Sequence, residues 1–182
     1  MKIERATTND NVILSEITKK SKAYWGYSEE QILKWKDSLT ISKEYIDANE
    51  VFNLTIENEI IGYYSYTIKE NNSVKLDNLF VLPYYIGKGF GKYLINDFLI
   101  KIQKSKFKKI VLDSEPYAEK FYQKMGFKKT GSFETSIKDR FMPIMEMILW
   151  QLKSFIIKTK ILVTYPKLQS KPHSHYRLEK QL

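Results

Sequence analysis

Three glycines alternate with other residues over a short stretch of the chain, at Gly87, Gly89 and Gly91. An apolar run ending at a proline precedes them, a helical pattern of apolar residues follows them, and Lys88 and Lys92 lie beside them. Unpaired N–H groups in such a turn and at the start of the helix converge on one point, which the helix dipole makes positive. One glycine would indicate only a turn. Three of them, which let the backbone approach a bulky anion, predict a phosphate-binding cradle.

The spacing of these glycines excludes two common phosphate-binding motifs. The loop of the nucleotide hydrolases requires GxxxxGK followed by Ser or Thr, and the sequence contains no such string. The dinucleotide-binding fingerprint GxGxxG also fails, because Lys92 occupies its last position when counted from Gly87. The cradle therefore belongs to another class of phosphate-containing ligand.

Composition excludes several kinds of catalytic chemistry. The sequence has no cysteine and two histidines, His173 and His175, both close to its end. Disulfides, thiolate metal sites and a cysteine nucleophile are excluded, and neither a histidine triad nor a zinc site is expected. Catalysis would have to use carboxylates, tyrosine, backbone groups and bound water, without a metal.

Length and composition indicate one globular domain. The chain has 182 residues, of which 43% are hydrophobic and 14% aromatic. The N-terminal sequence MKIERATTND lacks the apolar stretch of a signal peptide, and no uncharged apolar run reaches the ~18 residues of a membrane span. We therefore expect a cytoplasmic protein that does not contact a membrane.

The elements that must position the glycines are a series of strands interrupted by helices. Period-2 and β-branched patterns predict strands at residues 2–6, 52–56, 60–68, 74–81, 110–112, from 127 onward, and 144–150. Helical spacing and capping residues predict helices around residues 12–17, 29–39, 90–102 and 116–125. This order predicts an α/β fold with about four helices, in which a mixed, mostly antiparallel sheet splays apart at a parallel β-α-β crossover.

The net charge of +9 is unevenly distributed. Residues 151–182 contain seven basic residues and one acidic residue, so +6 of the charge lies there. We expect a domain over residues 1–150 and a basic, poorly ordered C-terminal extension over residues 151–182. The extension could contact nucleic acid, but a solvated tail is the preferred interpretation.

An aromatic segment, Tyr24, Trp25 and Tyr27 around a glycine, lies between the first two predicted helices. It could be a hydrophobic plug between those helices. It could equally be a lid over a ligand, because loops held by a scaffold often carry binding residues. The sequence leaves both interpretations open.

Two motifs and the order of the elements resemble the GNAT superfamily of N-acetyltransferases. Its glycine-rich turn is matched by Gly89-Phe90-Gly91 with Lys88 before it, while Ile86 stands where Gln or Arg is usual. A second signature, a helix ending in Phe/Tyr-Tyr-x-x-x-Gly-Phe, is matched by residues 121–127. The stretch from residue 22 to residue 28 is similar to a bacterial subgroup of these enzymes. The resemblance covers about residues 2–150.

The resemblance implies acetyl-CoA as co-substrate, bound where strand 74–81 separates from strand 110–113. The pantetheine amides would pair with the first of these strands, and the pyrophosphate would lie on the glycine turn. The cofactor-binding residues implied are Leu79, Phe80, Val81, Ile86, Gly87, Lys88, Gly89, Phe90, Gly91, Lys92, Tyr117, Ala118 and Phe121. Tyr117 stands where the family usually has Asn.

The resemblance also implies a direct transfer of the acetyl group to an amine. Tyr122 matches the general acid that protonates the leaving thiolate, although a core tyrosine is the alternative interpretation. A strand N–H near Leu79 could stabilise the oxyanion. The general base stays open between Asp77, Glu115 and water. The acceptor, a small molecule or a peptide, would meet Tyr24, Trp25 and Tyr27. A catalytically weak acyl-CoA-binding module is the alternative function, and a homodimer is left open.

Overall fold

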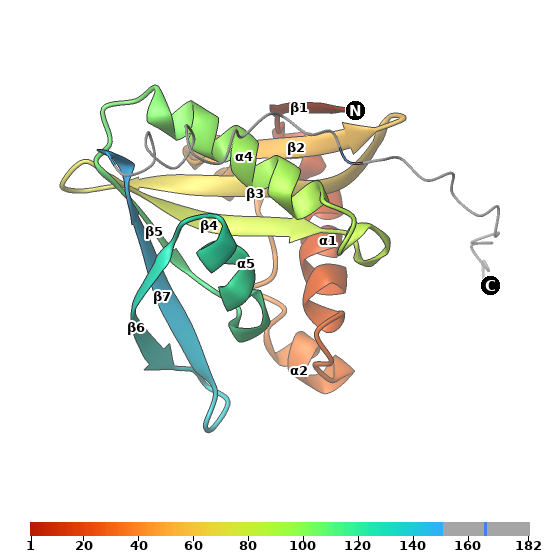
Figure 1. Ribbon diagram of the computed structural model, residues 1–182. Helices are drawn as coiled ribbons and strands as arrows, with labels where there is room; N and C mark the ends of the chain where they lie inside the picture. The colour runs from red at the N-terminus through yellow and green to blue at the C-terminus, as the bar shows by residue number, and fades with distance from the viewer. Residues whose placement is uncertain (151–165, 167–182) are drawn as a thin grey trace, which may run out of the picture.

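The computed structural model describes residues 1–150 and Pro166 (Figure 1). Its strands are β1 (Lys2–Arg5), β2 (Glu50–Ile56), β3 (Glu59–Lys69), β4 (Ser73–Val81), β5 (Lys109–Asp113), β6 (Lys128–Glu134) and β7 (Phe141–Ile148). Its α-helices are α1 (Asn11–Ala23), α2 (Glu29–Lys34), α3 (Lys43–Ala48), α4 (Phe90–Gln103) and α5 (Glu119–Lys124). Short 3-10 helices η1 (Thr8–Asp10), η2 (Pro83–Tyr85) and η3 (Pro116–Ala118) complete the described part. The predicted extension lies, apart from Pro166, outside the described residues.

The seven strands form one sheet in the order β1-β2-β3-β4-β5-β7-β6. Strands β1 to β4 pair antiparallel as a meander, and β5, β7 and β6 form a second antiparallel group. The two groups meet at a parallel pair, β4 with β5, which α4 connects. The predicted mixed α/β fold with a parallel crossover is therefore confirmed.

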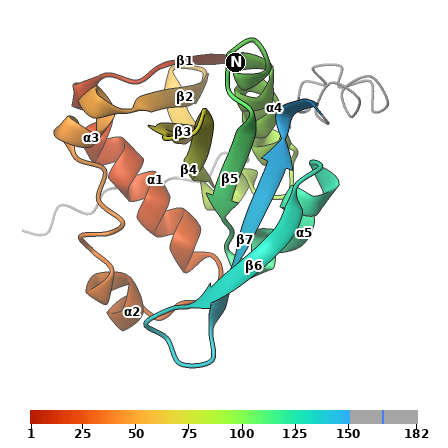
Figure 2. The ribbon, with the colours of Figure 1, turned by 90° about the vertical axis from the view of Figure 1, so that its left-hand side faces the viewer.

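Helices cover both faces of the sheet, with α1 and α3 on one side and α4 and α5 on the other (Figure 2). Adjacent tyrosines of β3 show how the strand supplies both cores, because side chains alternate between faces. Tyr63 packs with Leu14 of α1, whereas Tyr64 packs with the buried residues of α4. None of the helices in residues 1–150 is long and apolar enough to span a membrane.

Two helical segments differ from the sequence prediction. The helix predicted to reach residue 39 begins at the expected cap, where Ser28 Oγ accepts from the N–H of Gln31 at 3.2 Å, but α2 ends at Lys34. The chain then continues in turns, because the outward-facing residues after Lys34 offer no continuous apolar stripe. The prediction also missed α3, whose cap is Ser42.

The last strand begins earlier than predicted. Strand β7 starts at Phe141, includes Pro143, which was predicted to lie at its entry, and ends at Ile148 rather than at residue 150. The pairing of β7 with β5 begins at Ile144, which lies opposite Asp113. Pro143 is therefore outside that ladder, and the N–H that a proline lacks is not needed for pairing with β5. The carbonyl of Pro143 accepts from the N–H of Ser114 at 2.8 Å.

Candidate active site

The sheet opens between β4 and β5. These strands pair at three positions, from Ser73 opposite Lys109 to Lys75 opposite Val111. Beyond Lys75, β4 continues to Val81 paired with β3 alone, so the backbone groups on its other edge lack a strand partner. An ion pair of 2.6 Å between Lys75 and Asp113 joins the two strands where they diverge.

A cavity of about 590 Å³ occupies this opening. It brings together residues that are distant in the sequence. The predicted site residues that line it are Trp25, Asp77, Leu79, Phe80, Val81, Ile86, Gly87, Gly89, Gly91, Lys92, Glu115, Tyr117, Ala118, Phe121 and Tyr122. The lining residues that were not among the predicted site residues are Ser21, Lys22, Lys75, Asp113 and Met142.

The glycine turn forms one end of this cavity. Gly87 and Gly89 have φ values of +78° and +92°, which residues with a Cβ rarely adopt. Gly89 is also the N-cap of α4. Two members of the predicted set lie differently. The Phe90 side chain is buried in the core, so its backbone alone can face a ligand, and the Lys88 ammonium lies 3.3 Å from the ring centroid of Tyr84.

Changing Gly89 to alanine is expected to weaken acetyl-CoA binding about fivefold. Left-handed backbone costs an alanine about 1 kcal/mol, and the turn can relieve this strain by rotating its N–H groups away from the phosphate site. A Cβ at Gly89 would make an ordinary contact with Pro166 at 3.8 Å, so the expected effect comes from the backbone. Calorimetric titration with acetyl-CoA measures it.

Gly131→Ala is the matched control for this change. Its backbone is not left-handed, and an added Cβ would make ordinary contact with Ile144 at 3.7 Å. The affinity of the Gly131→Ala variant for acetyl-CoA should match that of the unchanged protein. Equal affinities for Gly89→Ala and Gly131→Ala would show that the glycine turn does not hold the phosphates.

The helix end around Gly126 fixes the position of Tyr122. The N–H of Phe127 donates to the carbonyl of Tyr122 at 3.1 Å, and the N–H of Gly126 donates to that of Gln123 at 3.0 Å. This is a Schellman motif, with Gly126 at φ +94°. The ring of Phe127 packs edge-on against that of Tyr122, with their centroids 5.8 Å apart. The motif therefore holds a tyrosine rigidly at the cavity.

The phenol of Tyr122 is suited to donate a proton. Burial raises its pKa above the ordinary value, so the hydroxyl stays protonated at neutral pH. Among the described residues no side chain or backbone group forms a hydrogen bond with that hydroxyl. A tyrosine of this kind on a cavity wall can donate to a ligand atom that becomes negative.

A β-bulge places Asp77 on the same cavity. Ser65 of β3 lies opposite Asn78 and Tyr66 lies opposite Leu76, so Asp77 is an extra residue without a partner in the ladder. Its Oδ2 accepts from the hydroxyl of Tyr45 at 2.6 Å. Strand β4 thus presents a carboxylate to the cavity near the point where β4 and β5 separate.

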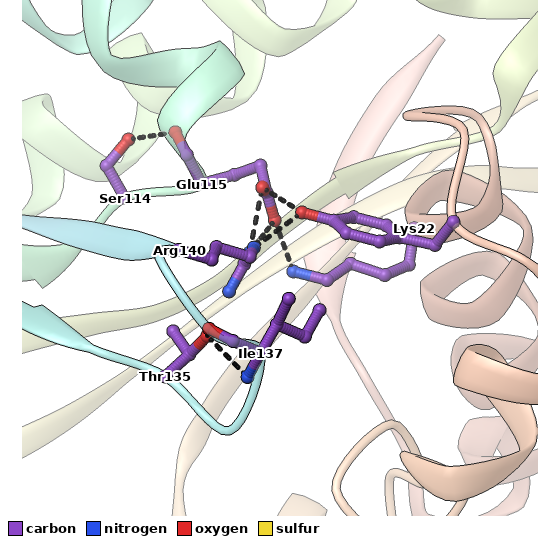
Figure 3. Close-up of polar contacts among 7 residues, drawn as sticks. Lys22, Ser114, Glu115, Thr135, Ile137 and Arg140 are labelled. Carbon is purple, nitrogen blue, oxygen red and sulfur yellow. Dashed lines mark hydrogen bonds and ion pairs between the residues drawn. The ribbon is translucent and has the colours of Figure 1, made fainter.

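Glu115 lies at the centre of a group of charged and aromatic residues (Figure 3). Its Oε1 accepts from Tyr27 at 2.6 Å and from Arg140 at 2.8 Å, and its Oε2 accepts from Lys22 at 2.5 Å and from Arg140 at 2.9 Å. Arg140 also donates to the Tyr27 hydroxyl, and the ring of Trp35 lies beneath both cations. We call Lys22, Tyr27, Glu115 and Arg140 the Glu115 cluster.

Comparisons with known proteins place these features in one family. The family model described as an acetyltransferase (GNAT) domain matches residues 25–149. The chain belongs to the GNAT acetyltransferase family. The matched residues include the glycine turn, the helix that carries Tyr122, and three members of the Glu115 cluster.

Solved structures share the GNAT fold at low sequence identity. The PaiA N-acetyltransferase of Thermoplasma acidophilum, in complex with coenzyme A, is 24% identical, with a TM-score of 0.69 over 81% of this chain and 98% of that one. The ribosomal-protein-S18-alanine N-acetyltransferase of Escherichia coli is 18% identical, with a TM-score of 0.62 over 81% of this chain and 93% of that one. No curated protein sequence matches the chain.

The charges of the Glu115 cluster suit a structural role in this GNAT domain. Burial opposes ionisation of Glu115, but the hydrogen bonds and charge of Lys22, with those of Tyr27 and Arg140, outweigh it and lower its pKa. Burial and the hydrogen bond to Glu115 raise the pKa of Tyr27 to about 12. Because both carboxylate oxygens already accept hydrogen bonds, Glu115 is less suited than Asp77 to take a proton from a substrate.

The aromatic segment between α1 and α2 lies over the GNAT cavity. Trp25 stacks on Tyr117 with ring centroids 5.4 Å apart and planes 7° apart. Tyr24 packs edge-on against Trp25 and is 53% exposed, whereas Tyr27 belongs to the Glu115 cluster. The segment is therefore attached to its surroundings at two points, and of its three aromatic residues Trp25 alone lines the cavity.

Sequence reasoning missed the cations of the GNAT site because long-range pairing defines their positions. From the sequence, Lys22 would be expected to be an exposed residue on the polar face of a helix. In the structure its side chain is only 14% exposed and pairs with Glu115. Lys75 lies two positions before Asp77 on β4. Because side chains two positions apart on a strand share a face, this spacing could have indicated that Lys75 lies near Asp77. Among the described residues no group of three or more His, Asp or Glu side chains could hold a metal ion.

Proposed function

We propose that the protein transfers an acetyl group from acetyl-CoA directly to the amine of an acceptor. The observation that carries this proposal is the cavity between β4 and β5, which places the glycine turn at one end and presents Asp77 and Tyr122 to the same space. A phosphate cradle next to a carboxylate and a protonated phenol suits acyl transfer from a CoA thioester, which needs a bound cofactor, a proton acceptor for the amine and a proton donor for the thiolate.

The residues around the opening fit an acyl-CoA. The unpaired edge of β4 from Leu79 to Val81 offers backbone groups to the pantetheine amides, like an added strand. The glycine turn and the start of α4 offer N–H groups to the pyrophosphate, with Lys92 in the first turn. At Gly91 a Cβ would be 3.8 Å from Phe121, so the turn lies close to α5. Acetyl-CoA supplies the activated thioester.

Two residues then perform the proton transfers. Asp77 accepts the proton that the attacking amine loses, directly or through a water molecule. Tyr122 donates its proton to the leaving thiolate. An N–H of β4 near Leu79 stabilises the negative charge that develops on the carbonyl oxygen. With no cysteine in the chain, no thioester with the enzyme can form.

We propose that the acceptor amine approaches through the part of the cavity lined by Lys22 and Trp25. That part lies beside the stacked rings of Trp25 and Tyr117 and beside the Glu115 cluster. The acceptor is an amine of a small molecule or of a peptide.

A thiol-release assay with acetyl-CoA and a panel of amines tests the proposed function. The panel should include polyamines, amino acids, aminoglycosides and peptides with free N-termini. We expect thiol release that depends on one class of amine, with acetylated product found by mass spectrometry. Tight binding of acetyl-CoA without turnover on any amine would instead support the acyl-CoA-binding module.

A further inference from the structure

A polar network behind Asp77 connects it to α3 and β3. The hydroxyl of Tyr45 lies 2.6 Å from Asp77 Oδ2, 2.7 Å from Ser65 Oγ and 3.0 Å from Asn78 Nδ2. Asn78 Nδ2 also donates to Ser65 Oγ at 2.8 Å. Ser65 is fully buried, and Tyr45 is partly buried against the core below α1.

The donors of this network all point toward the carboxylate. A tyrosine hydroxyl has one proton, and here Asp77 accepts it, so Ser65 must donate to Tyr45. Asn78 can only donate through its amide nitrogen, so it supplies both hydroxyls. Hydrogen bonds ordered in one direction polarise one another, which strengthens the last bond, from Tyr45 to Asp77.

The two oxygens of Asp77 therefore have different surroundings. Oδ2 is held by Tyr45, whereas Oδ1 forms no hydrogen bond within the described part of the chain. Asp77 has no partner in the ladder, and the bond from Tyr45 is the one hydrogen bond that orients its carboxylate within the described part of the chain.

We propose that Tyr45 is a positioning residue for the general base: it holds Oδ2 of Asp77 so that Oδ1 is presented to the acceptor amine. This inference rests on the proposed function, in which Asp77 accepts the amine proton. Other titratable groups near Asp77 are engaged elsewhere. Tyr63 bonds to Thr18, and two of the cations that line the cavity with Asp77, Lys22 and Lys75, pair with Glu115 and Asp113. The third, Lys92, lies in the first turn of α4 beside the glycine turn.

A double-mutant cycle between Tyr45→Phe and Asp77→Asn tests this inference. Tyr45→Phe should lower kcat about tenfold or more, the effect of losing a hydrogen bond to a charged group, with the KM for acetyl-CoA within about twofold of the original. Asp77→Asn should lower kcat by about 100-fold or more. The double variant should be no slower than Asp77→Asn, because Tyr45 acts through that carboxylate.

Tyr64→Phe is the matched control. The Tyr64 hydroxyl also donates to an aspartate, Asp97, at 2.6 Å, but this pair joins β3 to α4 and does not line the cavity. Its kcat should be unchanged, and thermal unfolding should show that all variants are folded. The amine used is the one identified by the thiol-release panel.

The outcome of the double-mutant cycle shows whether Tyr45 acts through Asp77. If the losses from Tyr45→Phe and Asp77→Asn multiply in the double variant, Tyr45 acts independently of Asp77 and the inference is wrong while the proposed function stands. An unchanged kcat in Tyr45→Phe also overturns the inference alone. If the unchanged protein releases no thiol with any amine although it binds acetyl-CoA, the proposed function fails and the inference fails with it.

Discussion

Turnover of a Tyr122→Phe variant is expected to fall about 100-fold or more, with acetyl-CoA affinity unchanged. The phenylalanine keeps the ring that packs against Phe127 and removes only the hydroxyl of this cavity-lining residue. The leaving thiolate then has to take its proton from water. Steady-state thiol release gives kcat, and calorimetric titration with acetyl-CoA gives the affinity.

Tyr66→Phe is the control for this loss of a phenol. Tyr66 is a half-buried residue of β3 whose ring packs against Phe52 and Phe98, and it does not line the cavity. Its turnover should equal that of the unchanged protein. If Tyr122→Phe also kept full turnover, Tyr122 would be a core tyrosine and water would protonate the thiolate.

Removing the charge of Glu115 is expected to destabilise the fold strongly. Glu115→Gln leaves Lys22 and Arg140 facing each other without a compensating carboxylate, at sites where these side chains are 14% and 12% exposed. Breaking a largely buried ion pair in this way costs about 3 kcal/mol. Urea denaturation monitored by circular dichroism measures the change in the free energy of unfolding.

The effect of Glu115→Gln should depend on pH with a defined sign. The folded state lowers the pKa of Glu115 below 4.5, so its stabilising contribution is complete above that value and is lost as the pH falls through the lowered pKa. The stability difference between the protein and the variant should therefore narrow below pH 4.5. Glu30→Gln, which removes an exposed pair with Lys34, should change stability little at any pH. A constant difference across the acidic range would contradict this account.

Local patterns explain why most of the fold could be predicted. The strand, glycine turn and helix around residues 79–103 are contiguous, and each glycine with positive φ had its own sequence signal. The helix end at Gly126 was equally local. The helix α3 was missed because Ile46 is its single fully buried apolar side chain, so it shows no helical stripe.

The tertiary contacts of the site could not be read from the chain in the same way. Lys22 and Glu115 are separated by 93 positions, and Tyr27 and Arg140 by 113. Which charges meet depends on how the strands diverge and where the loops close, and no periodicity encodes it. The bulge at Asp77 is a further case, since one unpaired residue changes the direction of a side chain without altering the pattern of hydrophobic residues.

Strands β1–β4 are joined to strands β5–β7 through the pairing of β4 with β5, which extends over three residue pairs. The ladder is therefore shortest at this junction, where the two halves are held mainly by the buried core that they share. An acyl-CoA bound between β4 and β5 would link both halves and favour the closed form by mass action. We therefore expect the resistance of the chain to proteolysis to rise with the concentration of acyl-CoA.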